Sequence, residues 1–328
     1  MNILKNLFLL TIVSIVCLLF LESITRILKI HGDTDPTYII ESDFLPFQMK
    51  PNTRSVSVYG KEFIINNLGL RGPQIEIHKE PDVKRILLLG DSVTYGYCEN
   101  YENIFSSILQ ERLDTNALGS WEVINGGHNG FNIKDSLNYF KNLGLQLDPD
   151  FVVLAVTASD NTNQSVEYII KDGINYSKGS KWIYIPAFIK KVLRKSSLYM
   201  SIGVLKGRMQ SHSSQSSTTG SVDTKKERML DSVGKEILEI SNISTENNID
   251  FLVLSIPSEF DIATGSYHHD FFSDIKDLST DYDFQFLDAI GFFDNEKQNY
   301  CLNDPAHLQY EGHKVISDVI LNYLATRI

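Results

Sequence analysis

Short apolar runs that alternate with amphipathic segments constrain the fold of this chain most strongly. The runs predict five buried strands, at residues 86–89, 121–124, 151–156, 251–256 and 284–287. Helical periodicity follows them, at residues 104–113, 133–147, 227–248 and 310–328. Parallel strands need such crossover segments, because each strand must return to the same side of the sheet. The alternation predicts an α/β fold, a flavodoxin-like three-layer α/β/α sandwich with a five-stranded parallel sheet.

The N-terminus carries a second strong pattern, because residues 7–21 contain no charge and are flanked by further apolar residues. With these flanks the segment 3–30 is long enough to span a bilayer. No small-residue cleavage site follows, so we expect a retained single-pass anchor rather than a removed signal peptide. Flanking charges are balanced, and we favour an extracytoplasmic body. A buried first helix is the alternative.

The remaining chain divides by composition into a cap and a main domain. We expect residues 1–32 to be anchor and juxtamembrane helix, 33–83 a small β-rich cap, and 84–328 the main domain with an insertion at 161–224. The insertion is basic over residues 178–208. Its helical pattern near 185–193 either packs on the domain with a solvated cationic face or faces an anionic surface or ligand. Residues 211–221 are typical of a flexible loop.

Ser92 directly follows the first predicted strand, in the run Gly90-Asp91-Ser92. Taken alone, Ser92 is equally typical of a helix cap and of a nucleophile at the sheet edge that binds ligands. Asp304 and His307 stand three residues apart just before the last helix. A sheet of this type brings that turn near Ser92, so Asp304 can orient His307 as the base. A surface histidine is the alternative for His307.

Oxyanion donors are expected at the ends of the second and third strands. Gly130 closes a glycine-rich turn, where a backbone N–H can approach a substrate oxygen closely. Other chemistries are disfavoured. The net charge of −11 argues against nucleic acid. His268, His269 and Asp270 lack the spacing of a metal site, and no phosphate-binding glycine loop is present, so we expect neither metal nor cofactor.

Three blocks now occur in order: Gly90-Asp91-Ser92, Asn125-x-Gly127-x-x-Gly130 and Asp304-x-x-His307. Together they resemble the SGNH (GDSL-type) hydrolase superfamily over residues 84–328. The run Asn66-x-x-Gly69-x-Arg71-Gly72 is similar to membrane-anchored bacterial members. The resemblance implies an acyl-Ser92 intermediate, with oxyanion donors from the Ser92 N–H, the Gly130 N–H and an asparagine after the third strand.

The third block departs from the family pattern, because Ser159 stands where the family has asparagine. A hydroxyl is a shorter donor than an amide, and Asn161 is the less favoured substitute. The leading hypothesis is a serine esterase acting on a small acyl ester, an acetylated glycan or a lipid ester. The alternatives are an O-acyltransferase to a glycan hydroxyl and a catalytically degenerate binding module.

Cys98 and Cys301 flank the two halves of this predicted site, since one follows Ser92 and the other precedes Asp304. If Ser92 and His307 meet, the two thiols are close neighbours. A disulfide between them is one hypothesis and two unrelated buried thiols are the other.

Overall fold

The computed structural model describes residues 2–28, 39–57, 61–116, 119–160, 168–171, 174–177, 186–193, 195–199, 201–202, 233–265, 270–294, 297–302 and 304–327. The predicted loop 211–221, the pair His268 and His269, the amide Asn161 and the N-terminal part of the predicted helix 227–248 lie outside these residues.

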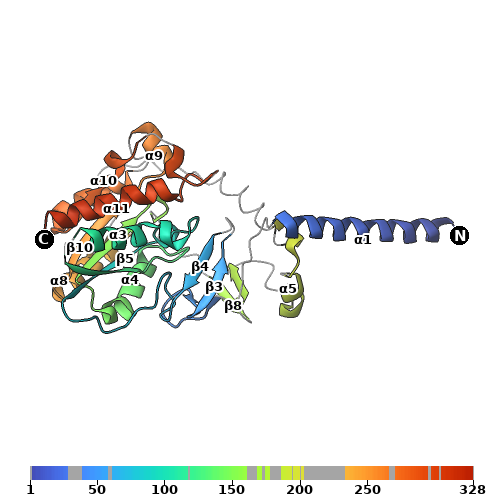
Figure 1. The fold of residues 1–328 in the computed structure, drawn as a ribbon, viewed down its shortest axis with the longest axis horizontal. Coiled ribbons are helices and arrows are strands. Elements are labelled where there is room, and N and C mark those ends of the chain that lie inside the picture. The colour runs from blue at the N-terminus through green and yellow to red at the C-terminus, as the bar shows by residue number, and fades with distance from the viewer. Residues whose placement is uncertain are drawn as a thin grey trace.

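A five-stranded parallel sheet forms the centre of the main domain (Figure 1). The strands are β5 (Val83–Leu89), β6 (Ser120–Asn125), β7 (Phe151–Val156), β10 (Asp250–Ser255) and β11 (Gln285–Asp288). Their order across the sheet is β11-β10-β7-β5-β6, and every neighbouring pair is parallel. Counted along the chain this is the order 2-1-3-4-5 of flavodoxin-like sheets. The predicted fold is confirmed.

Helices cover both faces of the sheet. On one face α3 (Phe105–Thr115) and α11 (Tyr310–Ala325) pack against strand side chains that include Ile86 and Leu88. On the other face lie α4 (Ile133–Asn142), α8 (Lys235–Glu246) and α10 (Phe271–Tyr282), against alternate residues that include Leu87 and Leu89. All four of these β5 side chains are fully buried, as a central parallel strand requires.

Two helices between β10 and β11 have no counterpart among the predicted elements: α9 (Glu259–Thr264) and α10. A parallel connection requires a crossover, and α10 supplies it. Its buried residues Phe271, Phe272, Ile275 and Leu278 recur at helical spacing. This periodicity is visible in the sequence and is sufficient to predict the helix.

The cap consists of two antiparallel strand pairs that pack on the main domain. β1 (Ile39–Ile40) pairs with β2 (Gln48–Met49), and β3 (Thr53–Val56) pairs with β4 (Glu62–Ile65). The buried side chains Phe47, Met49, Phe63 and Ile65 belong to the same hydrophobic cluster as α4 and α8. The cap therefore shares a hydrophobic core with the main domain.

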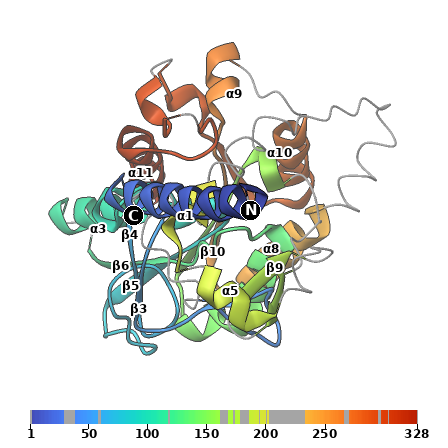
Figure 2. The same cartoon turned by 90° about the vertical axis from the view of Figure 1, so that its right-hand side faces the viewer.

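The N-terminal helix α1 (Asn2–Leu28) projects away from the rest of the molecule (Figures 1 and 2). Its segment Ile3–Leu28 has a mean hydropathy of 2.6 and none of the window is buried, so its length and composition suffice to cross a membrane. A signal sequence meets the same criteria. The alternative of a buried first helix is wrong.

The described part of the insertion contains a hairpin and a helix. The hairpin β8 (Tyr168–Lys171) and β9 (Ile174–Ser177) is not among the predicted elements. The intervening pair Asp172-Gly173 is a typical hairpin signal in the sequence. The helix α5 (Ala187–Leu193) lies within the predicted helical segment.

Candidate active site

Ser92 is the first residue of the short helix α2 (Ser92–Tyr95), which follows β5 after a tight turn at Gly90 and Asp91. Gly90 has a φ of 151°, and a Cβ there would lie 2.8 Å from the Ala155 carbonyl oxygen, so only glycine fits. Asp91 caps α2, because its Oδ1 accepts a hydrogen bond of 2.8 Å from the Val93 N–H. The turn fixes Ser92 at the carboxyl edge of the sheet, which we define by the strand ends at Gly90, Asn125 and Thr157.

The structure brings Ser92, His307 and Asp304 into one hydrogen-bonded chain. Ser92 Oγ lies 2.8 Å from His307 Nε2 although the two residues are 215 positions apart. His307 Nδ1 lies 2.7 Å from Asp304 Oδ2. Asp304 Oδ1 accepts from the Ala306 and His307 N–H groups, each at 3.1 Å, which fixes the carboxylate. This arrangement leaves Nε2 of the neutral imidazole as the acceptor for the Ser92 proton.

A disulfide joins the two loops that carry these residues. Cys98 and Cys301 are bonded, with their Cα atoms 6.6 Å apart. The Cys301 N–H donates to the His307 carbonyl and the Asp304 N–H donates to the Cys301 carbonyl, each at 2.9 Å. The bond therefore ties the segment after α2 to the turn that contains Asp304 and His307. Of the two hypotheses for these cysteines, the disulfide is the one present in the structure.

Arg71 holds the same segment from the side of the cap. The residue is 2% exposed, and its guanidinium group donates to the carbonyls of Tyr95, at 2.7 Å, and of Gly96 and Glu99. The ring of Phe63 lies 4.4 Å from the guanidinium carbon. Burial lowers the pKa of Arg71 to about 10, which still leaves the side chain charged at neutral pH. Arg71 therefore clamps the C-terminal end of the helix that begins at Ser92.

The motif that contains Arg71 shapes the turn that presents it. Asn66 Oδ1 accepts from the Leu68 and Leu70 N–H groups, and its Nδ2 donates to the Pro73 carbonyl. Gly69 has a φ of 77°. The role of Arg71 could not be predicted from the sequence, because the groups that it contacts are backbone carbonyls, which every residue provides.

The glycine-rich turn after β6 packs closely on α2. A Cβ at Gly127 would lie 2.6 Å from the Tyr95 nitrogen, so this position requires glycine. Asn125 fixes the turn, because its Oδ1 accepts from the Gly127 N–H at 3.0 Å and its Nδ2 donates to the Thr94 carbonyl at 2.9 Å. Gly130 ends the turn with a φ of 84°. Its predicted part in an oxyanion site stays a prediction.

His128 belongs to this turn, and its buried side chain stacks on Phe131, with ring centroids 4.3 Å apart. Its Nδ1 lies 2.9 Å from the Gly126 carbonyl, which assigns the proton to Nδ1. Burial lowers the pKa of His128 to about 4. This histidine is therefore neutral and structural at neutral pH.

The third strand end carries a network of hydroxyls and carboxylates. Ser159 Oγ donates to Asp91 Oδ2 at 3.1 Å, and Thr157 Oγ1 lies 2.9 Å from the same oxygen. Asp160 accepts from the Thr157 N–H at 2.8 Å. Burial, with Asp91 close by, raises the pKa of Asp160 well above its usual range. The Ser159 hydroxyl is thus directed toward Asp91, and its predicted oxyanion role stays a prediction.

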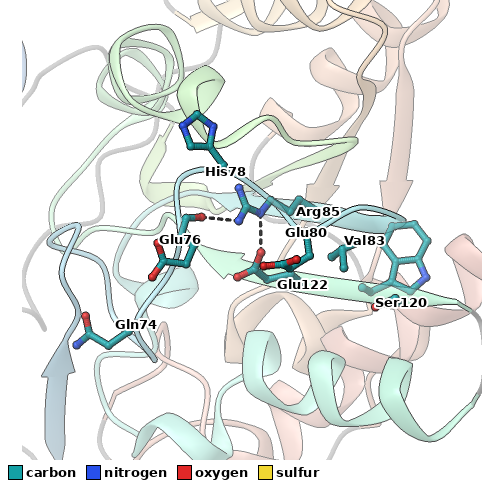
Figure 3. Close-up of a pocket in the computed structure, with 9 residues that line it drawn as sticks. Gln74, Glu76, His78, Glu80, Val83, Arg85, Ser120 and Glu122 are labelled. Atoms are coloured by element: carbon teal, nitrogen blue, oxygen red, sulfur yellow. Dashed lines mark hydrogen bonds and ion pairs between the residues drawn. The ribbon is translucent and has the colours of Figure 1, made fainter.

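A second group of charged side chains lies at the opposite, amino edge of the sheet, which we define by the strand starts at Val83 and Ser120. Arg85 is buried there and donates to Glu122 at 2.5 Å, to the Ile77 carbonyl at 2.6 Å and to the Leu147 carbonyl at 2.8 Å. Figure 3 shows Arg85 between Glu122 and the Glu76 backbone, in a cleft of about 300 Å³. The hydrogen-bond donors of the Arg85 guanidinium group are thus bonded to Glu122 and to backbone carbonyls. Within the described residues no set of three or more His, Cys, Asp or Glu is placed to hold a metal ion.

No family model matches this chain, and no curated protein matches it. Several solved esterase and lipase structures are similar to it at low identity. The acetyl xylan esterase AlAXEase is 17% identical, covers 73% of this chain and 98% of its own, and has a TM-score of 0.45. A lipase/acylhydrolase from Enterococcus faecalis is 14% identical. The match covers 74% of this chain and 96% of that protein, with a TM-score of 0.44. TesA is 12% identical. The match covers 75% of this chain and 100% of TesA, with a TM-score of 0.46.

Proposed function

We propose that this protein is a serine esterase of the SGNH hydrolase superfamily that cleaves a small acyl ester through an acyl-Ser92 intermediate. The observation that carries the proposal is the chain from Ser92 Oγ through His307 to Asp304, with contacts of 2.8 and 2.7 Å. These distances are within the range in which a base activates a hydroxyl nucleophile.

The geometry supports a two-step mechanism. Ser92 Oγ attacks the ester carbonyl carbon while His307 Nε2 takes the hydroxyl proton. Asp304 accepts the hydrogen bond from Nδ1–H and stabilises the imidazolium that forms. The tetrahedral intermediate collapses, and His307 returns the proton to the departing alcohol. Water, deprotonated by His307, then attacks the carbonyl carbon of the acyl-Ser92 ester. The bond from that carbon to Ser92 Oγ breaks, His307 returns the proton to Oγ, and the acid leaves.

The oxyanion of each tetrahedral intermediate needs hydrogen-bond donors. The proposed donors are the backbone N–H groups of Ser92 and Gly130. Ser159 is a weak third donor, because its hydroxyl bonds Asp91 at 3.1 Å and must leave that carboxylate to reach a substrate. Losing one such donor typically costs about 3 kcal/mol of transition-state stabilisation. We therefore expect a slow enzyme.

We infer an ester of a glycan or a lipid as the substrate, and a membrane anchor in α1. The anchor is supported by the apolar segment Ile3–Leu28 and by the absence of a small-residue cleavage site after it. We therefore propose that the active site works next to a membrane.

The test is labelling with a fluorophosphonate and hydrolysis of a short p-nitrophenyl ester by membrane and soluble fractions. We expect one labelled band in the membrane fraction, lost in Ser92→Ala together with the esterase activity. Equal labelling or equal hydrolysis by Ser92→Ala contradicts the mechanism. Product analysis with a glycan acceptor then separates hydrolysis from acyl transfer.

A further inference from the structure

The helix α5 turns an apolar face outward instead of packing it on the main domain. Phe188 and Val192 lie one helical turn apart and are 69% and 65% exposed. Ile189 on the same face and Ile202 shortly after the helix are also exposed. The helix of a soluble domain normally buries such a stripe. A contiguous exposed apolar surface indicates a partner that covers it.

Hydrogen bonds fix the segment after α5 to the last turns of α1. Glu22 accepts from the Ser196 hydroxyl at 2.7 Å and from the N–H groups of Ser197 and Leu198 at 2.8 and 2.9 Å. Arg26 donates to the Lys195 carbonyl at 2.8 Å. Glu22 directly follows the uncharged run of residues 7–21. These bonds hold α5 beside the C-terminal end of α1, and Figure 1 shows the two helices next to each other there.

The charge of this part of the chain matches an anionic surface. Residues 178–208 contain eight lysines and arginines and no acidic residue, although the whole chain has a net charge of −11. Four of the eight basic residues lie in or directly after α5, at 190, 191, 194 and 195. A short helix with exposed apolar residues and many basic ones is typical of a segment that lies in a membrane interface.

We propose that α5 and the residues up to Ile202 form a second membrane contact, which lies on the anionic lipid surface that α1 enters. Phe188, Val192 and Ile202 insert among the lipids, and the positive charge of residues 178–208 favours anionic headgroups. The contacts of Glu22 and Arg26 keep both membrane segments at one level. This inference rests on the anchor assigned to α1 under the proposed function.

The contact also orients the active site. The helix α11 begins three residues after His307 and is about 24 Å long at 1.5 Å per residue. It runs to the C-terminus, which lies on the side of the molecule away from α1 (Figure 1). The carboxyl edge with Ser92 and His307 therefore lies on the side of α1. The esters that reach Ser92 most readily are those held at the membrane surface.

The contact is tested with the full-length Cys17→Ser chain in lipid nanodiscs with and without phosphatidylglycerol. An environment-sensitive fluorophore is attached to Phe188→Cys or Val192→Cys, with Cys98 and Cys301 left bonded. Ala325→Cys is the matched control, because it is exposed and lies near the C-terminus. We expect blue-shifted emission and quenching by spin-labelled lipid at 188 and 192 and not at 325, stronger with phosphatidylglycerol. Emission equal to that of the control, or shielding from lipid and water alike, overturns the proposal.

The orientation is tested with Phe188→Ser/Val192→Ser, which alters two exposed side chains. We expect turnover of an ester embedded in anionic vesicles to fall about tenfold, while hydrolysis of a soluble ester stays unchanged. Equal turnover of the vesicle ester by both chains, or equal loss on both substrates, overturns the orientation. Failure of Ser92 to react with fluorophosphonate refutes the esterase proposal instead, and the fluorophore experiment still decides the contact.

Discussion

The two edges of the sheet both carry buried arginines and carboxylates, but only one surrounds the proposed nucleophile, Ser92. At the amino edge, Arg85 is bonded to Glu122 and to backbone carbonyls. At the carboxyl edge, three features fix the short segment that holds Ser92: Arg71, the disulfide and the Asp91 cap. The hydrogen-bonded chain from Asp304 through His307 ends there at the partly exposed Ser92 hydroxyl. The difference shows that a cluster of charged side chains indicates a functional site only where it positions a group that a ligand can reach.

The sharpest test of this contrast pairs one carboxylate from each edge. Asp304→Asn should lower kcat/KM about 10⁴-fold, because an amide does not stabilise the imidazolium and favours the wrong tautomer. Glu122→Gln should leave kcat/KM unchanged and lower only stability, since it removes the ionic partner of Arg85. Ester hydrolysis and thermal unfolding of both variants give the comparison. Equal losses of activity would abolish the distinction between the edges.

A gain of function probes the weakest part of the carboxyl edge. Ser159→Asn should raise kcat about a hundredfold, because an amide supplies the donor that the Asp91-bound hydroxyl withholds. Ser120→Asn, at an exposed position of the amino edge, is the control and should have no effect. The readout is single-turnover acylation of Ser92. Unchanged rates in both variants would mean that position 159 does not face the oxyanion, and absence of any activity would favour a binding module.

The two buried arginines provide the next comparison. Arg71→Lys retains the charge but cannot bond the Tyr95, Gly96 and Glu99 carbonyls together, so α2 should shift and kcat should fall tenfold to a hundredfold. Arg85→Lys should reduce stability without changing kcat of the folded enzyme. Circular dichroism and active-site titration correct for unfolded protein. If Arg85→Lys slows the folded enzyme as much as Arg71→Lys does, then Arg71 is not a positioning residue.

The smallest effect concerns acid stability, which we expect to depend on the carboxyl edge. Burial lowers the pKa of His128 to about 4, below the 6.5 of an unfolded histidine. The folded state therefore binds fewer protons between these values, and the free energy of unfolding should decrease as pH falls from 6.5 to 4. His128→Asn, which can keep a donor to the Gly126 carbonyl, should reduce the slope by about one proton. Urea unfolding across this pH range measures it, and an unchanged slope would exclude His128 as the source.

Residues with a local or periodic signature were predictable from the sequence. Apolar runs in the sequence predict the buried strands. The order of the elements that follow these strands then predicts that Ser92, Gly130 and His307 lie at the carboxyl edge of the sheet. The crossover helix α10 and the hairpin β8–β9 also carry visible signals, in the periodicity of Phe271 to Leu278 and in the Asp172-Gly173 pair. Both elements were therefore predictable from local sequence patterns, although neither is among the predicted elements.

The sequence by itself determined the sheet, its strand ends and the order of the reactive residues, because strand burial and turn chemistry act over a few neighbouring positions. Only the tertiary structure decided what surrounds Ser92. Arg71 bonds backbone carbonyls that any residue provides, and the Ser159 hydroxyl turns to Asp91 because the two strand ends meet. The exposed face of α5 was equally undetermined, since an apolar stripe has the same sequence whether it faces a core or a membrane.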